Sequence, residues 1–302
     1  MCVVCSSVQV SDPQIEVDED CVLYELAEPH IARITINRPD RRNAILSPDM
    51  HGLFEERLAR AEADDDVKVV ILDAVGTDFC AGDDVRRLPV ERAGLAKGKK
   101  LPQTARMANA RRLHRHLTNW LEFPKTVIAA CQGATVGAGM NLALAADIVI
   151  LSDDAYFARP QSRIGFAGFS TAMPLALLKF GPNRGYEAMI TGRKIGAEEL
   201  REWGVTSTVV PRDDLGDHAL RYARAIAHHS ADGLMIGKAA LITFWNAVGM
   251  AQFGDWVQMA HPLFTNLVWR DDEFNFVRER DRLGAKEALR ELSRRYSEWG
   301  FE

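Results

Sequence analysis

The fold of this chain is decided by Gly133-Ala-Thr-Val-Gly-Ala-Gly139-Met-Asn141, a glycine-rich stretch near the middle of its 302 residues. The apolar run 127–130 precedes this stretch, and the alanine-rich run 142–146 follows it. A strand that turns through glycines into a helix leaves the first N–H groups of that helix without intrahelical partners. The helix dipole adds roughly half a positive charge at the same end. The stretch therefore predicts a site for an anion, or for an oxygen atom that gains negative charge during a reaction.

Two other interpretations of this turn remain open at this point. Its glycine spacing also occurs in the dinucleotide-binding turns of short-chain dehydrogenases, although a lone glycine pattern is weak evidence. Those enzymes need a tyrosine four residues before a lysine, and none of the five tyrosines here has a lysine at that position. The turn also lies near mid-chain, whereas the dinucleotide fingerprint usually follows the first strand. A tight turn with a purely structural role is the second alternative.

A second glycine turn lies upstream and favours a different chemistry. The run 69–72 reads as a buried strand, and Phe79-Cys-Ala-Gly-Asp-Asp84 follows it. Two strand-to-glycine-turn units can each offer one backbone N–H, and two converging N–H donors form an oxyanion hole. The sequence therefore predicts that the two turns meet.

With these turns in view, the chain resembles the crotonase superfamily, the enoyl-CoA hydratase/isomerase family. The matching segments follow the order and spacing of the family from about residue 20 to about residue 285. They are Asn37-Arg38-Pro39-x3-Asn43-Ala44, Phe79-Cys-Ala-Gly-Asp-Asp84, Gln132-Gly133-x3-Gly137-Ala-Gly139 with Ala146-Asp147, Phe157-x2-Pro160 and Phe276-x3-Arg280.

The resemblance implies an α/β fold, a crotonase-like repeated ββα superhelix with a C-terminal helical trimerisation region. It implies an N-terminal tail over residues 1–20, a core with a CoA-thioester site over 21–212, and a helical oligomerisation region over 213–302. The expected assembly is a homotrimer or a dimer of trimers. The expected partner is an acyl-CoA thioester, as in fatty acid metabolism, with CoA as part of the substrate and no other cofactor.

The resemblance also assigns roles to individual residues. Asp83 and Ala138 are expected to donate the two backbone N–H groups that hold the thioester oxygen as an enolate forms. Asn141 and Gln161 occupy the positions at which hydratases of the family carry glutamates. The residues expected to contact the substrate are Arg38, Asn43, Ala44, Ala81, Asp84, Gly137, Phe276 and Arg280.

The two amides leave the reaction open. An amide has no proton to exchange near neutral pH, so it cannot replace a carboxylate in general acid–base catalysis. One hypothesis is a hydratase-like enzyme that uses another titratable group, for which the candidates are Asp83, Asp84, His114 and Tyr156. A second is thioester or ring hydrolysis or decarboxylation, in which Asn141 and Gln161 orient water or substrate. A third is a non-catalytic oligomer that binds a CoA thioester.

Composition sets further expectations. The formal net charge of −5 without an evident basic face argues against nucleic acid as the main partner. No run is long and apolar enough for a spanning helix, and the N-terminus lacks the pattern of a secretory signal. We therefore expect a cytoplasmic protein with no membrane partner. Five scattered cysteines indicate neither a disulfide framework nor a complete metal site, so no metal is expected.

Two segments near the predicted site carry separate expectations. Apolar residues from Met107 to Leu121 recur at helical spacing, and His114 lies on that stripe as a packed core residue. His116 lies off the stripe and is expected to be exposed. The polar stretch from Arg86 to about Gln103 is, by resemblance, the variable segment that covers the acyl pocket.

Overall fold

The computed structural model describes residues 18–46, 49–85, 102–167, 172–264 and 267–301. The expected cover of the acyl pocket lies largely within 86–101, and the expected tail lies within 1–17 apart from its last residues. Both predictions therefore fall almost wholly outside the described residues.

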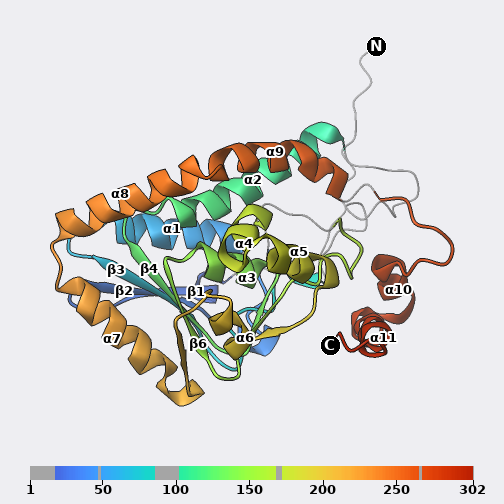
Figure 1. Cartoon of the computed structure of the whole chain (residues 1–302), viewed down its shortest axis with the longest axis horizontal. Helices are drawn as coiled ribbons and strands as arrows, with labels where there is room; N and C mark the ends of the chain where they lie inside the picture. Colours follow the sequence, from blue (N-terminus) through green and yellow to red (C-terminus); the bar gives the residue numbers. More distant parts are fainter. Residues whose placement is uncertain (1–17, 47–48, 86–101, 168–171, 265–266, 302) are drawn as a thin grey trace, which may run out of the picture.

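A six-stranded sheet forms the centre of the molecule (Figure 1). Its first two strands pair antiparallel, and every later neighbour pairs parallel. The central strands are buried on both faces, which explains their continuous apolar runs. In spatial order the strands are β1 (Val22–Glu28), β2 (Ile31–Ile36), β3 (Val69–Ala74), β4 (Thr126–Cys131), β6 (Ile148–Ser152) and β9 (Thr208–Val210).

A smaller sheet lies beyond the carboxyl ends of the central strands. It consists of β5 (Ala134–Val136), β7 (Tyr156–Ala158) and β8 (Ile195–Gly196). The chain passes from β4 through β5 into helix α3 (Ala138–Ala145), and from β6 through β7 towards helix α4 (Met173–Phe180). Two strands followed by a helix thus recur along the chain, which confirms the predicted ββα repeat.

Helices cover both faces of the large sheet. On one face lie α1 (Asp49–Ala63), α2 (Gln103–Leu121) and α3, whose buried side chains share one core with the sheet. On the other face lies α7 (Leu215–Ala227), which packs Leu215, Ala219 and Ala223 against β2, β3 and β4 (Figure 1). Helix α7 falls within the region 213–302 expected to serve oligomerisation, yet its apolar stripe completes the core of the subunit.

The remaining helices surround this core, and some of them also contribute buried residues to it, such as Met189, Leu200 and Met250. They are α5 (Pro182–Thr191), α6 (Ala197–Glu202), α8 (Ala231–Ala247), α9 (Met250–Phe264), α10 (Phe276–Leu283) and α11 (Ala285–Ser297). Helices α8 and α9 run along the outer side of α2, and α10 packs on α11 (Figure 1). No single described helix has the length and apolar character to cross a bilayer. Helix α8 and the first part of α9 meet these criteria of length and apolar character only when they are taken as a pair, and the pair is bent by 53°.

Gly133 fixes the start of the organising turn, and its replacement should destabilise the fold. A Cβ atom at this position would lie 2.2 Å from the Thr77 carbonyl oxygen, and the residue has φ +53°. Gly133→Ala should therefore lower the free energy of unfolding by on the order of 3 kcal/mol, measured by denaturant unfolding. The control is Gly52→Ala on α1, where a Cβ meets nothing within 4 Å and alanine should be neutral or stabilising. Equal stability of the two variants would contradict the expected clash.

Candidate active site

The two glycine turns lie side by side. The upstream turn forms a β-bridge between Cys80 and Thr135, so it extends the small sheet next to β5. The Cys80 N–H donates to the Ala134 oxygen at 2.9 Å, and the Val136 N–H donates to the Cys80 oxygen at 2.8 Å. Backbone pairing, rather than side-chain contact, therefore fixes the position of one turn against the other.

Glycines permit the closest approach between these turns. A Cβ atom on Gly82 would lie 2.9 Å from the Val136 oxygen and 3.7 Å from the Ala138 nitrogen. A Cβ atom on Gly137 would lie 3.7 Å from the Gly82 Cα, and both glycines have positive φ, +89° and +55°. The residue before Asp83 thus lies against Ala138, the first residue of α3. A side chain at either glycine would separate the two segments.

The cysteines that flank the turns are packing residues. Burial raises the pKa of Cys80 to about 12 and raises the pKa of Cys131 well above its ordinary value. A Cβ atom on Gly139 would lie 2.6 Å from the Cys80 Cβ, so this thiol fills the space under the first turn of α3. Since the thiolate is the nucleophilic form, neither cysteine suits nucleophilic catalysis.

Asp78 ties the arginine-rich loop after β2 to the central turn. Arg42 donates to its two carboxylate oxygens at 2.8 and 2.9 Å, and the Ala134 N–H donates to one of them at 2.9 Å. Burial opposes ionisation of Asp78, but these hydrogen bonds and the one from the Thr77 hydroxyl outweigh it and lower its pKa to about 2. The carboxylate is therefore ionised at neutral pH and serves as an anchor.

Asn43 shapes the same loop from inside. Its side chain is fully buried at φ +56°, donates to the Val75 and Asp78 oxygens at 2.8 and 2.7 Å, and accepts from the Arg38 N–H at 2.7 Å. The Arg38 guanidinium donates to the Ala44 oxygen. Asn43 thus holds the conformation of the loop that also carries Arg38 and Ala44, and all three residues are predicted to contact the substrate.

The loop is also hydrogen-bonded to the upstream turn. The Ala81 N–H donates to the Arg42 oxygen at 2.9 Å, the Ile45 N–H to the Gly82 oxygen at 2.8 Å, and the Asp84 N–H to the Ile45 oxygen at 3.0 Å. The Asp84 side chain is only 7% exposed. The structure therefore places Ala81 and Asp84 beside the predicted donor Asp83, and the buried Asp84 lies within the framework of the turn.

Asn141 and Gln161 both lie at the central turn, and Arg159, which the sequence did not mark as functional, is hydrogen-bonded to Asn141. The Arg159 Nη1 donates to the Asn141 Oδ1 at 3.1 Å. Gln161 directs its Nε2 at Gly137, 2.7 Å from where a Cβ would stand, while its Oε1 is buried without a hydrogen-bond partner. Burial lowers the pKa of Arg159 to about 10, partly offset by the negative charge of Asp83. The only signal for Arg159 in the sequence is its place in the Phe157-x2-Pro160 segment.

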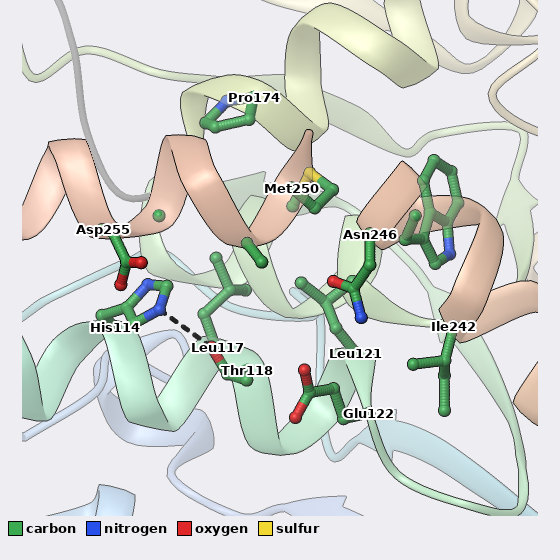
Figure 2. A pocket seen from close by; sticks show the side chains of 13 residues that line it. His114, Leu117, Thr118, Leu121, Glu122, Pro174, Ile242, Asn246, Met250 and Asp255 are labelled. Atoms are coloured by element: carbon green, nitrogen blue, oxygen red, sulfur yellow. Dashed lines mark hydrogen bonds between the residues drawn. The ribbon is translucent and has the colours of Figure 1, made fainter. Parts of the chain in front are cut away.

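His114 lies in a different environment from these residues. It lines a cavity of about 120 Å³ between α2, α4, α8 and α9, where Figure 2 shows its ring beside Asp255. Its Nε2 is 3.4 Å from the Thr118 hydroxyl, and its ring fills the space where Gly254 lacks a side chain. None of the other residues predicted to serve catalysis or substrate binding lines this cavity.

Tyr156, another proposed acid–base group, is engaged elsewhere. Lys194 lies over its ring at 5.3 Å from the centroid. The Asp78 carboxylate is the main cause of the raised pKa of Arg42, and the nearby Tyr156 phenol adds to it. Tyr156 therefore belongs to the surroundings of Arg42 and Asp78. In the described part of the chain, no three histidine, cysteine or carboxylate side chains are grouped so as to hold a metal ion.

The prediction that His116 is exposed is wrong. Its side chain is 7% exposed and stacks on His51 of α1, with ring centroids 3.9 Å apart, and neither ring nitrogen has a hydrogen-bond partner. The periodicity of α2 alone identifies the face towards the main core but not the face that α1 covers. Burial lowers the pKa of His51, and the negative charge of Asp83 partly offsets this effect. The charge of this histidine, which was not predicted to matter, therefore interacts with a residue of the site.

This histidine pair should make stability depend on pH. Burial and the neighbouring His51 hold the pKa of His116 well below 6.5, so below about pH 6.5 the unfolded chain binds a proton that the native state does not. Stability should then fall with decreasing pH by up to about 1.4 kcal/mol per unit for this group. Denaturant unfolding between pH 8 and pH 5 should show a shallower dependence for His116→Phe. An unchanged slope would contradict the assignment.

Phe276 and Arg280 lie on α10. Phe276 is fully buried in a small cluster with Ile164 and Phe166, which follow Gln161 in the chain. The Arg280 Nη1 donates to the Val85 oxygen at 3.2 Å, one residue after Asp84. Within a single subunit, α10 therefore packs against segments that continue from the two sides of the candidate site.

Comparison with known proteins identifies the class to which this fold and site belong. The family model described as enoyl-CoA hydratase/isomerase matches residues 27–277, so the chain belongs to that family. The mevalonyl-coenzyme A hydratase SIDH of Beauveria bassiana is 32% identical over 73% of this chain and 78% of its own length. A probable enoyl-CoA hydratase of Mycobacterium bovis is 34% identical over 76% of this chain and 79% of its own length. The crystal structure of an enoyl-CoA hydratase/isomerase from Xanthobacter autotrophicus has a TM-score of 0.79 at 28% identity, covering 91% of this chain and 98% of that one.

Proposed function

We propose that this enzyme binds an acyl-CoA thioester with the carbonyl oxygen between the backbone N–H groups of Asp83 and Ala138. These groups stabilise the negative charge on that oxygen when an enolate forms at the adjacent carbon. Such donors act on charge that develops in the transition state, so each is worth about 10²–10³ in rate. Membership of the family and the names of the relatives support a CoA thioester as the substrate.

The close approach of Gly82 to the Ala138 nitrogen carries this proposal. A Cβ on Gly82 would lie 3.7 Å from that nitrogen, so the segment that leads into Asp83 passes directly beside the start of α3. An N-terminal residue of a helix has no intrahelical acceptor for its N–H, and the helix dipole favours negative charge there. These features favour an electronegative oxygen at this point.

The proton transfers require groups other than the two amides. Asn141 and Gln161 can orient a substrate or a water molecule but cannot take or give a proton near neutral pH. Asp83 and His51 are the titratable residues whose charges interact at the site, and Asp83 also acts on Arg159. We propose a hydratase-like reaction in which this neighbourhood, rather than residues 141 and 161, handles the proton.

The amides favour a second candidate function. Thioester hydrolysis and decarboxylation also pass through a negatively charged carbonyl oxygen, and decarboxylation generates the enolate without removal of a proton by a base. The hydrogen bond from Arg159 to Asn141 orients that amide as a fixed polar group. Such a site suits the positioning of a substrate more than proton transfer.

Incubation of the purified protein with crotonyl-CoA and with longer, cyclic and carboxylated acyl-CoAs tests these functions. Loss of the double bond without release of CoA supports hydration, release of CoA supports hydrolysis, and release of carbon dioxide supports decarboxylation. Tight binding without turnover supports a non-catalytic binder. Failure to bind any CoA thioester contradicts the proposal as a whole.

We further propose a homotrimer or a dimer of trimers in the cytoplasm. Exposed apolar side chains on α8 and α9 support an interface between subunits: Met235, Ile236, Phe244 and Trp256. An apolar surface of this kind is typical of protein–protein contacts. Phe276 and Arg280 keep their proposed role in binding the CoA moiety.

A further inference from the structure

Arg159 is a buried cation whose partner in the structure is neutral. Arg159 is 4% exposed, and its Nη1 donates to the amide oxygen of Asn141 at 3.1 Å. Among the described residues, no carboxylate oxygen lies within 4 Å of its guanidinium nitrogens. A buried charge is costly unless an opposite charge or several hydrogen bonds compensate it.

Another buried cation of the same chain is treated differently. Lys238 on α8 is 5% exposed, and its Nζ contacts both carboxylate oxygens of Asp147 at 2.6 Å. The Asp147 carboxylate therefore compensates the charge of Lys238 inside the protein. Arg159 lacks such a partner, although Asp83 is near enough for its charge to act on the guanidinium.

The position of Arg159 is next to the proposed thioester site. Asn141, its hydrogen-bond partner, lies on the first turn of α3, three residues after Ala138. Gln161, two residues after Arg159, directs its Nε2 at Gly137, and its buried Oε1 has no hydrogen-bond partner. The Arg159 guanidinium is thus hydrogen-bonded to the first turn of α3, and the Gln161 amide lies against Gly137. Both groups are donors suited to a carboxylate.

We propose that the acyl group of the substrate carries a carboxylate that pairs with Arg159. The inference rests on the proposed function and adds the class of substrate, a short dicarboxylic acyl-CoA such as a malonyl, succinyl or glutaryl thioester. The guanidinium offers a planar fork that matches a carboxylate, and the ligand supplies the negative charge that the protein omits. The neutral side chains of Asn141 and Gln161 avoid the repulsion that carboxylates at these positions would exert.

Binding measurements separate this inference from the proposed function. Titration calorimetry of the full chain would compare succinyl-CoA with butyryl-CoA, which has four acyl carbons but no carboxylate. A charge-assisted pair of this kind should make succinyl-CoA bind about 10- to 100-fold more tightly. Arg159→Met should remove that preference while the affinity for butyryl-CoA changes little. Arg163→Met is the matched control, since Arg163 lies in the same segment but donates to the Thr191 and Phe301 backbone oxygens.

Asn141→Asp provides a second test that keeps the arginine. A carboxylate at this position would pair with Arg159 inside the protein, so the preference for succinyl-CoA should fall at least as far as in Arg159→Met. This variant decides the question if Arg159→Met does not fold.

The results distinguish failure of the carboxylate assignment from failure of the proposed function. Equal affinity of the native protein for the two thioesters, or a preference that survives both variants, overturns the carboxylate assignment and leaves the proposed function intact. If Arg159 only stabilises the enolate, succinyl-CoA and butyryl-CoA should also bind with equal affinity, because the enolate is absent from the bound ground state. Failure to bind either thioester overturns the proposed function and this inference with it.

Discussion

Gly137→Ala is expected to reduce kcat/KM for an acyl-CoA substrate by about 10²- to 10³-fold, the usual cost of losing one oxyanion donor. Gly137 precedes Ala138 and has φ 55° and ψ −111°, a conformation that residues with a side chain rarely adopt. An added Cβ would lie 2.7 Å from the Gln161 Nε2. The backbone must then rotate or the amide must move, and rotation would turn the Ala138 N–H away from the thioester oxygen.

The control for this variant is another glycine at positive φ. Gly181 precedes α5 with φ +82°, and a Cβ there would meet nothing within 4 Å. Gly181→Ala should lose about 1–2 kcal/mol of stability through backbone strain but keep its kcat/KM. Steady-state kinetics and unfolding of both variants distinguish strain from loss of a donor. A folded Gly137→Ala protein with native kcat/KM would remove the basis of the oxyanion proposal.

Asn141→Glu combined with Gln161→Glu should raise the rate of crotonyl-CoA hydration by about 10²-fold or more, since each acid–base group is worth roughly 10²–10⁴. The two carboxyl groups should differ in protonation. At position 141 a carboxylate would lie next to the Arg159 guanidinium and stay ionised, as a general base requires. At position 161 the buried, unpartnered Oε1 indicates an environment that favours a neutral carboxylic acid, as a proton donor requires.

The single variants are the controls for this gain. Each supplies one half of an acid–base pair, so each should hydrate crotonyl-CoA much more slowly than the double variant in a spectrophotometric assay of double-bond loss. A native protein that already hydrates crotonyl-CoA as fast as the double variant would show that residues other than 141 and 161 suffice. Activity created only by the substitutions would show that the native reaction is not hydration.

The sequence predicted the framework of the site well because that framework is built from local signals. The glycines at 82, 133 and 137 adopt positive φ, and a Cβ atom added at any of them would lie within 3 Å of another backbone or side-chain atom. Such positions tolerate no other residue, so they can be recognised in the sequence from the spacing of the glycines. The ββα repeat was likewise visible, because β3 and β4 are buried on both faces and read as continuous apolar runs.

The electrostatics of the site could not be predicted in the same way. His116 appeared exposed because its environment depends on α1, a helix more than fifty residues earlier in the chain. In the sequence, Arg159 is marked only by its place in the Phe157-x2-Pro160 segment. Its burial and its contact with Asn141 at the central turn appear only in the structure. Periodicity reports one face of one element, whereas the state of a charged side chain depends on all the elements packed around it.

The most direct test of the central claim is a crystal structure of the protein with a non-reactive acyl-CoA analogue. We expect the thioester carbonyl oxygen to lie about 2.7–3.1 Å from the backbone nitrogens of both Asp83 and Ala138. A carbonyl oxygen bound elsewhere, or within hydrogen-bonding distance of only one of these nitrogens, would contradict it.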